Sequence, residues 1–253
     1  MAYDELKAYR YQDNNIQGKC NTFLIHSPTL QEIVDYGEKR YWSEVFNITS
    51  TAFDERLYLY SKKIDYNTVS DFQVFLEMKR DNLLPISSIV LPSIKFNDFE
   101  ILERKEKTNE DNFILYNSTT DTVITEKDYN DITDFIRKIN GLHKNATKDG
   151  NKETRNWRLK RDLEKLEAEI EMGITHNFHS VLQPYISALT NTEGFKYNWH
   201  TVWDLPIDVF IDSLYRFQII DRAKNLTNGM YSGNIDVSAI DKSDFNYLKR
   251  IEF

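Results

Sequence analysis

The stretch TVITEKDYNDITDFIRKING (residues 122–141) contains both kinds of hydrophobic periodicity found in this chain. TVIT (122–125) is rich in β-branched residues and follows two other strand-like segments, DFEILER (98–104) and NFILYNS (112–118), with polar turns between them. From residue 126 the apolar residues instead recur at helical spacing: Tyr129, Ile132, Phe135, Ile136 and Ile139. A three-stranded sheet this small needs a helix to cover it. The stretch therefore predicts a small antiparallel sheet over 98–125, covered by a helix that ends at Gly141.

Helical patterns precede this sheet. SPTLQEIVDYGEKRYWSEVF (27–46) starts with Thr29 and Glu32 at the spacing of a capping box, in which each side chain satisfies a free backbone N–H of the first turn. Gly37 interrupts the pattern, and we expect a close backbone approach there. Further helices are predicted at 53–61 and from the cap Ser70 over 70–79, while NTFLIH (21–26) is briefly strand-like.

Three more helices are predicted after residue 141. The first, over 153–172, is highly charged and has a narrow apolar seam at steps of four, three and four: Leu159, Leu163, Leu166 and Ile170. The second covers 178–190, with Pro184 near its start. The third is the longest, over 205–224, with Asp204 as its cap and Pro206 in its first turn.

The eight residues GMYSGNID (229–236) follow the longest helix. Gly229 is placed to end that helix, and Gly233 permits a second turn with positive φ. We expect Tyr231 and Ile235 to pack back on the helix. The sequence as a whole predicts a mainly α-helical α+β fold, with bundle-like N- and C-terminal helical regions and the small antiparallel sheet between them. The predicted division is 1–95 and 96–253, or one continuous domain.

Composition and charge exclude several classes of protein. Hydrophobic residues make up 40% of the 253 residues and the net charge is −8, which favours a packed globular protein and disfavours a surface for nucleic acid or anionic membranes. The single cysteine, Cys20, cannot form an internal disulfide. No signal peptide or membrane-spanning run is recognisable, so we expect a cytoplasmic protein.

Charge is unevenly distributed between two neighbouring segments. Residues 98–134 include eleven acidic and four basic side chains, whereas residues 144–165 include eight basic and four acidic ones. Trp157 lies among these cations, as at a nucleic-acid surface. We favour a solvated helix with ion pairs such as Arg158 with Asp162 and Arg161 with Glu164, and the asymmetry also allows self-association.

Motifs for catalysis, nucleotides or metals are incomplete. Gly229 and Gly233 have no basic residue between them for a phosphate, so a structural turn is favoured. The oxygen ligands of Asn234, Asp236 and Asp241 lack the spacing of a calcium loop, and helix capping suits the two aspartates better. His176, His179 and His200 permit a metal site without requiring one. We therefore expect no catalytic residue, cofactor or bound metal.

Several segments together resemble a known family. PTLQEIVDYGE (28–38), IDYNTVSDFQVF (64–75), YNDITDFIRKINGL (129–142), WDLPIDVFIDSLYR (203–216) and YSGNID (231–236) are similar, in the same order over nearly the whole chain, to tail-morphogenesis proteins of the tail assembly chaperone type from tailed phages of Gram-positive hosts. The resemblance implies a non-enzymatic helper in the cytoplasm of the infected host, which binds the tape-measure protein and tail-tube subunits. A structural virion component and a phage effector that binds a host or defence protein are the alternatives.

Helix-in-groove capture of an amphipathic tape measure requires exposed apolar side chains. Three groups of residues are candidates, although large apolar side chains more often belong to a core. The candidates are Tyr41, Trp42 and Phe46; Trp157, Leu159, Leu163 and Leu166; and Tyr197, Trp199 and Trp203.

Overall fold

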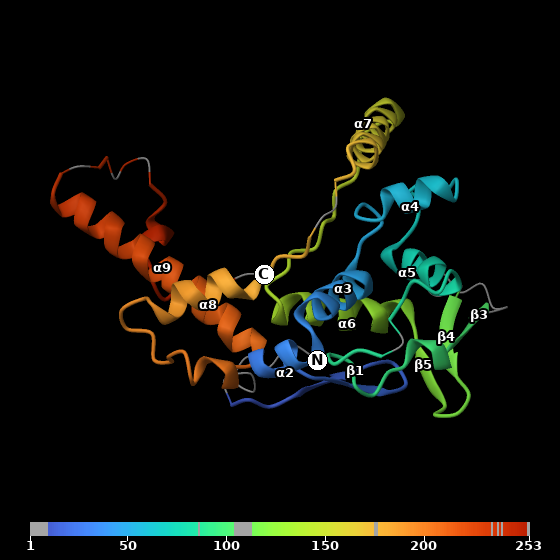
Figure 1. Cartoon of the computed structure of the whole chain (residues 1–253), viewed down its shortest axis with the longest axis horizontal. Coiled ribbons are helices and arrows are strands. Elements are labelled where there is room, and N and C mark those ends of the chain that lie inside the picture. Colours follow the sequence, from blue (N-terminus) through green and yellow to red (C-terminus); the bar gives the residue numbers. More distant parts are fainter. Residues whose placement is uncertain are drawn as a thin grey trace.

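Helices dominate the structure, a computed structural model that describes residues 10–85, 87–103, 113–174, 177–233, 235–236, 238 and 240–251. They surround the central helix α6 (Glu126–Ile139) and accompany two small antiparallel sheets (Figure 1). Two helices, α7 (Lys152–Glu171) and α9 (Ile207–Tyr231), extend away from the rest of the molecule (Figure 1). The predicted mainly α-helical α+β fold is thus confirmed.

The sheet predicted over 98–125 is present. A short 3-10 helix, η1 (Phe96–Asp98), leads into β3 (Glu100–Glu103), which pairs with β4 (Phe113–Asn117), and β4 pairs with β5 (Thr122–Ile124), both antiparallel. The ends of the predicted strands at residues 104 and 112 lie outside the described residues.

Helix α6 (Glu126–Ile139) follows β5 directly. Its N-cap, Thr125, forms a capping box with Asp128, whose carboxylate also accepts the backbone N–H of Lys19 at 2.8 Å. Helix α6 also contacts α3 (Glu38–Thr49): the Tyr41 hydroxyl donates to Asn140 Oδ1 at 2.6 Å, and the Tyr129 hydroxyl donates to the Ile48 carbonyl at 3.1 Å. Helix α6 therefore joins the sheet to the N-terminal helices.

A second sheet, missed in the sequence, joins β1 (Asn14–Gln17) to β2 (Thr22–Ile25). The prediction found only β2, because β1 is the polar stretch NNIQ. Its buried residues are Asn14 and Ile16, and Ile16 lies opposite Phe23 in the antiparallel register. Pairing with an apolar strand, rather than its own composition, makes this segment a strand.

The predicted helix over 27–46 is two helices, α2 (Leu30–Tyr36) and α3 (Glu38–Thr49). The Thr29–Glu32 capping box is confirmed at the start of α2. Gly37 separates the helices with φ of +95°, a conformation that strains other residues. The expected close approach is wrong: a Cβ at Gly37 would meet its nearest neighbour, Arg40 Cβ, only at 3.9 Å.

Helices α4 (Arg56–Ser61) and α5 (Asp71–Arg80) follow, and Ser70 caps α5 as predicted, with Gln73 completing the capping box. Helix α7 (Lys152–Glu171) matches its predicted range. Helix α8 (Leu182–Thr190) begins later than predicted, with Pro184 in its first turn. The carboxylate of Glu38 accepts the N–H groups of Val181 and Leu182 at 2.7 and 2.9 Å, so α3 supplies the cap of α8.

Helix α9 (Ile207–Tyr231) is the longest helix described, but its cap is Pro206 rather than Asp204. Asp204 instead ends a 3-10 helix, η2 (Val202–Asp204). Two backbone hydrogen bonds fix the start of α9 against the start of α2: Leu30 N to Leu205 O at 2.9 Å and Ile207 N to Pro28 O at 2.8 Å. Pairing with a distant segment, rather than a local cap, thus sets where α9 begins.

Helix α9 continues through Gly229, so the predicted stop at this residue is wrong. Gly233, with φ of +70°, has the predicted positive φ just after the helix. The chain then returns along α9, as expected: Ile235 lies against Gly229, and η4 (Lys242–Phe245) packs on the helix. Tyr231 is 82% exposed, which contradicts its predicted packing.

Buried side chains form one continuous cluster from β1 and β2 through α6 to α8 and the first turns of α9. Residues from both sides of position 95 contribute to this cluster. In the part of the chain that the structure describes, no helix combines the length and apolar character that crossing a membrane requires.

Candidate interaction surface

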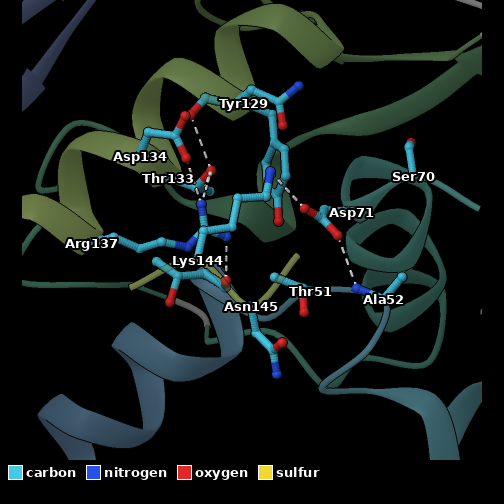
Figure 2. A network of polar contacts seen from close by, with 12 residues as sticks. Thr51, Ala52, Ser70, Asp71, Tyr129, Thr133, Asp134, Arg137, Lys144 and Asn145 are labelled. Atoms are coloured by element: carbon cyan, nitrogen blue, oxygen red, sulfur yellow. Dashed lines mark hydrogen bonds and ion pairs between the residues drawn. The ribbon is translucent and has the colours of Figure 1, made fainter. Parts of the chain in front are cut away.

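A network of polar contacts holds the base of the segment that leads into α7 (Figure 2). The Arg137 guanidinium, with its side chain only 5% exposed, donates to the Thr49 carbonyl, to Thr133 Oγ1 and to Asp134 Oδ1. Nearby, Lys144 Nζ lies 2.9 Å from Asp71, which also accepts the backbone N–H of Ala52 at 2.9 Å. These contacts fix helices α3, α5 and α6 around the point where the chain departs toward α7.

A cavity of about 350 Å³ opens beside this network. Its lining includes Phe46, Glu55, Arg137 and His143. Burial raises the pKa of the Glu55 carboxyl, against the opposing effect of its hydrogen bond with Ser50. Because Arg137 already donates to three acceptors of the protein, the arrangement suits a structural clamp better than an anion site.

Ion pairs and ring contacts anchor the N-terminal half of α7. Arg56 of α4 pairs with Asp162 at 2.7 Å, and Arg155 pairs with Asp65. The guanidinium groups of Arg56 and Arg158 lie over the ring of Phe53, at 4.6 and 5.1 Å from its centre. This half of the helix is therefore fixed by partners distant in the sequence.

Asp149 is the centre of this anchor. Its carboxylate accepts the Tyr66 hydroxyl and the Arg158 guanidinium, the latter at 3.0 Å, and its carbonyl accepts Asn67 Nδ2 at 2.9 Å. The hydrogen bond from Tyr66 and the charge of Arg158 lower the pKa of Asp149. Burial and the neighbouring carboxylate raise the pKa of Tyr66 to about 12.

The ion pairs predicted within α7 are different in the structure. Arg158 pairs with Asp149 rather than Asp162, and Glu164 pairs with Lys160 at 3.7 Å rather than with Arg161. The acidic partners of Lys144, Arg155 and Arg158 are Asp71, Asp65 and Asp149. All three partners lie outside the acidic segment 98–134.

Three of the ten candidate partner-binding residues belong to the core. Tyr41 is 0% exposed, Trp42 5% and Leu159 8%. The Tyr41 hydroxyl donates to Asn140 at the end of α6, and the Trp42 indole N–H donates to the Glu38 carboxylate. Leu159 belongs to the core cluster. A partner cannot reach these three residues in this conformation, so their prediction as partner-binding residues is wrong. Phe46, one turn after Trp42, is exposed.

The remaining candidates on α7 are accessible. Trp157 is exposed and stacks with Arg161, whose guanidinium lies 5.0 Å from the ring centre. Leu163 is half-buried and Leu166 is exposed. The candidate set omitted Ile170, Met172 and Ile174, which are also exposed. Ile170 continues the same four-three-four spacing, so the sequence contained a signal for it.

Tyr197, Trp199 and Trp203 gather before α9. The Trp203 indole donates to the Trp199 carbonyl at 2.8 Å, and the hydroxyls of Tyr197 and Tyr11 are 2.7 Å apart. The hydrogen bond with Tyr197 and burial raise the pKa of Tyr11 to about 12. Trp199 is exposed while Tyr197 and Trp203 are half-buried, so this group offers a smaller accessible surface than α7.

The incomplete ligand motifs can be placed only in part, because His176 and Asn234 lie outside the described residues. Within the described ranges, no three His, Cys, Asp or Glu side chains form a group that could hold a metal ion. Asp241 caps η4, as predicted, by accepting the Ser243 N–H at 2.8 Å. Asp236 accepts the Ser238 N–H at 2.9 Å in a local turn.

Comparison with known proteins gives one informative match. No curated protein and no solved structure matches the chain. Residues 179–252, which include α8, η2, α9 and η4, match the family model of the YomV second domain. That family is phage-derived, of the Bacillus phage SPBc2 type. The C-terminal part of this chain is therefore similar to a phage domain, which supports a phage protein.

Proposed function

We propose that this protein is a non-enzymatic assembly factor of the tail assembly chaperone type, which binds helical tail proteins while a phage virion is built. The observation that supports it is α7, a helix of 20 residues held away from the body and anchored only along part of its length (Figure 1). The proposed partners are the tape-measure and tail-tube proteins, and the proposed location is the cytoplasm of the infected host.

The C-terminal match supports the phage origin in this proposal, and the exposed apolar side chains of α7 support the binding of another protein. Exposed apolar surface held on a rigid element is typical of protein interaction sites. An assembly factor of this kind needs neither a cofactor nor a catalytic group.

The test is a pull-down with tagged protein from infected cells, together with mass spectrometry of purified virions. We expect tail proteins in the pull-down and no copy of this protein in finished particles. Its presence in virions would favour a structural tail component instead. Recovery of a host or defence protein without tail proteins would favour an effector, for which the net charge of −8 suits a cationic target.

A further inference from the structure

One face of α7 has an apolar stripe that is covered at one end and exposed at the other. The stripe runs through Leu159, Leu163, Leu166 and Ile170, which lie on one face at helical spacing. Exposure rises along it, from 8% at Leu159 to 44% at Leu166 and 70% at Ile170. Leu159, at the start of the stripe, belongs to the core cluster, and α4 contacts α7, whereas Leu166 and Ile170 farther along the stripe are exposed.

The end of the helix extends this exposed surface. Gly173 has φ of +61°, its N–H donates to the Ile170 carbonyl at 3.0 Å, and the N–H of Ile174 donates to the Glu169 carbonyl at 2.9 Å. This pair of hydrogen bonds is the Schellman motif, which turns the chain back over the last helical turn. We call Leu166, Ile170 and Ile174, all exposed, the overhang.

The overhang is preformed in this structure, because the Schellman motif closes the end of α7 and the Asp149 anchor holds the start of the helix. A preformed surface loses less conformational entropy on binding than a flexible segment does. Helix α7 projects from the body of the protein (Figure 1), and the overhang belongs to its last turns and the residues that follow them.

Charges beside the overhang define the partner. Residues 162–171 include five acidic side chains and one basic one, and Glu167, Glu169 and Glu171 flank the stripe near its exposed end. A partner with cations beside its own apolar stripe would be attracted, as in the paired flanking positions of a coiled coil. A second copy of this chain would place like charges opposite each other, and an anionic membrane would be repelled.

We propose that the overhang binds an amphipathic α-helix of another protein whose apolar stripe is flanked by lysine and arginine. This inference rests on the proposed function and specifies both the surface and the chemistry of the partner. The apolar side chains give the area of contact, and the acidic flanks select the charge of the partner.

The test uses two designed amphipathic peptides with the same apolar residues, one with lysine and one with glutamate beside the stripe. Titration of the full chain, followed by fluorescence anisotropy, should show the lysine peptide binding at least about tenfold more tightly. Raising the salt concentration should reduce this preference. Equal binding of the two peptides, or no binding of the lysine peptide, would overturn the inference.

Variants locate the binding on the overhang. The double variant Leu166→Asp/Ile170→Asp should weaken binding of the lysine peptide by at least about tenfold, with an unchanged circular dichroism spectrum because both residues are exposed. Leu248→Asp is the control, since it makes the same change of an exposed apolar side chain to a carboxylate, but outside α7. Glu167→Lys/Glu171→Lys should shift the preference toward the glutamate peptide.

Other outcomes are equally informative. Loss of binding in Leu248→Asp but not in the double aspartate variant would place the site away from the overhang and refute the inference. If light scattering shows a dimer that only the double aspartate variant abolishes, the occupant is a second copy and the proposed partner is wrong.

The failure of this inference can be separated from that of the proposed function. If the double aspartate variant still captures tail proteins from infected cells, the assembly role stands and the overhang is not the site. If the lysine peptide binds as expected but the unmodified chain captures no tail protein, the overhang binds helices and the assembly role is refuted.

Discussion

Gly18 is the position at which a single methyl group should disturb the fold most directly. It starts the turn between β1 and β2, where its N–H donates to the Asn21 carbonyl at 2.8 Å. A Cβ added to Gly18 would lie 2.6 Å from Phe23 Cε2 and 2.7 Å from Asp128 Oδ1. Phe23 is 2% exposed and Asp128 is 1% exposed, so neither side chain can move away into solvent without loss of its present contacts.

The cost of Gly18→Ala follows from these contacts. Overpacking of a filled core costs roughly 1–3 kcal/mol. Displacement of Asp128 would also weaken the cap of α6, which is a loss of about 1 kcal/mol. Alanine also lowers the conformational entropy of the unfolded chain, which stabilises the folded state by roughly 0.4–1 kcal/mol and partly offsets the loss. We therefore expect the free energy of unfolding to fall by roughly 1–3 kcal/mol.

Urea denaturation followed by circular dichroism measures this change. Gly150→Ala is the control, because a Cβ at Gly150 would have no neighbour within 4 Å. That variant should stay within about 0.5 kcal/mol of the parent or become slightly more stable. If Gly18→Ala were as stable as Gly150→Ala, the packing of the β1–β2 turn against α6 described here would be wrong.

Four further predictions concern the base of α7, the end of α9 and ligands. Arg137→Leu should lower the free energy of unfolding by roughly 2–4 kcal/mol in urea titrations, because the buried Thr49 carbonyl loses its donor. Gly233→Val should cost roughly 1–3 kcal/mol because φ is positive, whereas Gly150→Val should not, and thermal melting compares the two. The pKa of Asp149 is lowered in the folded chain, so the ionised carboxylate stabilises the fold above the ordinary pKa of 3.8, and this stabilisation is lost as pH falls through the folded pKa. Amide hydrogen exchange in α7 should therefore become faster over that pH range. In Asp149→Asn the exchange rate should no longer depend on pH in this way. Zinc, calcium, magnesium and ATP should each leave the melting temperature unchanged, and a shift equivalent to about 2 kcal/mol would reveal a missed site.

The starts of α2, α5, α6 and α7 could be predicted from the sequence because capping is local. The boxes formed by Thr29 with Glu32 and by Ser70 with Gln73 join residues three positions apart, so their hydrogen bonds depend on the chain next to them. The same holds for the positive φ of Gly233. The apolar periodicity likewise predicted α6 and α7, since each helix buries or presents one face along its own length.

The sequence alone did not decide which side chains another segment would cover. Tyr41 and Phe46 belong to the same helix and have the same aromatic character, yet the first is buried against α6 and the second is exposed. Strand β1 exists because β2 lies beside it, and α9 starts where its backbone meets the segment before α2. Arg155 and Arg158 are paired with Asp65 and Asp149, which only folding brings near. Local hydrogen bonds and hydrophobic periodicity depend on residues close together in the sequence, whereas burial and long-range ion pairs depend on the whole tertiary structure. For that reason the exposed part of α7 could be identified only from the structure.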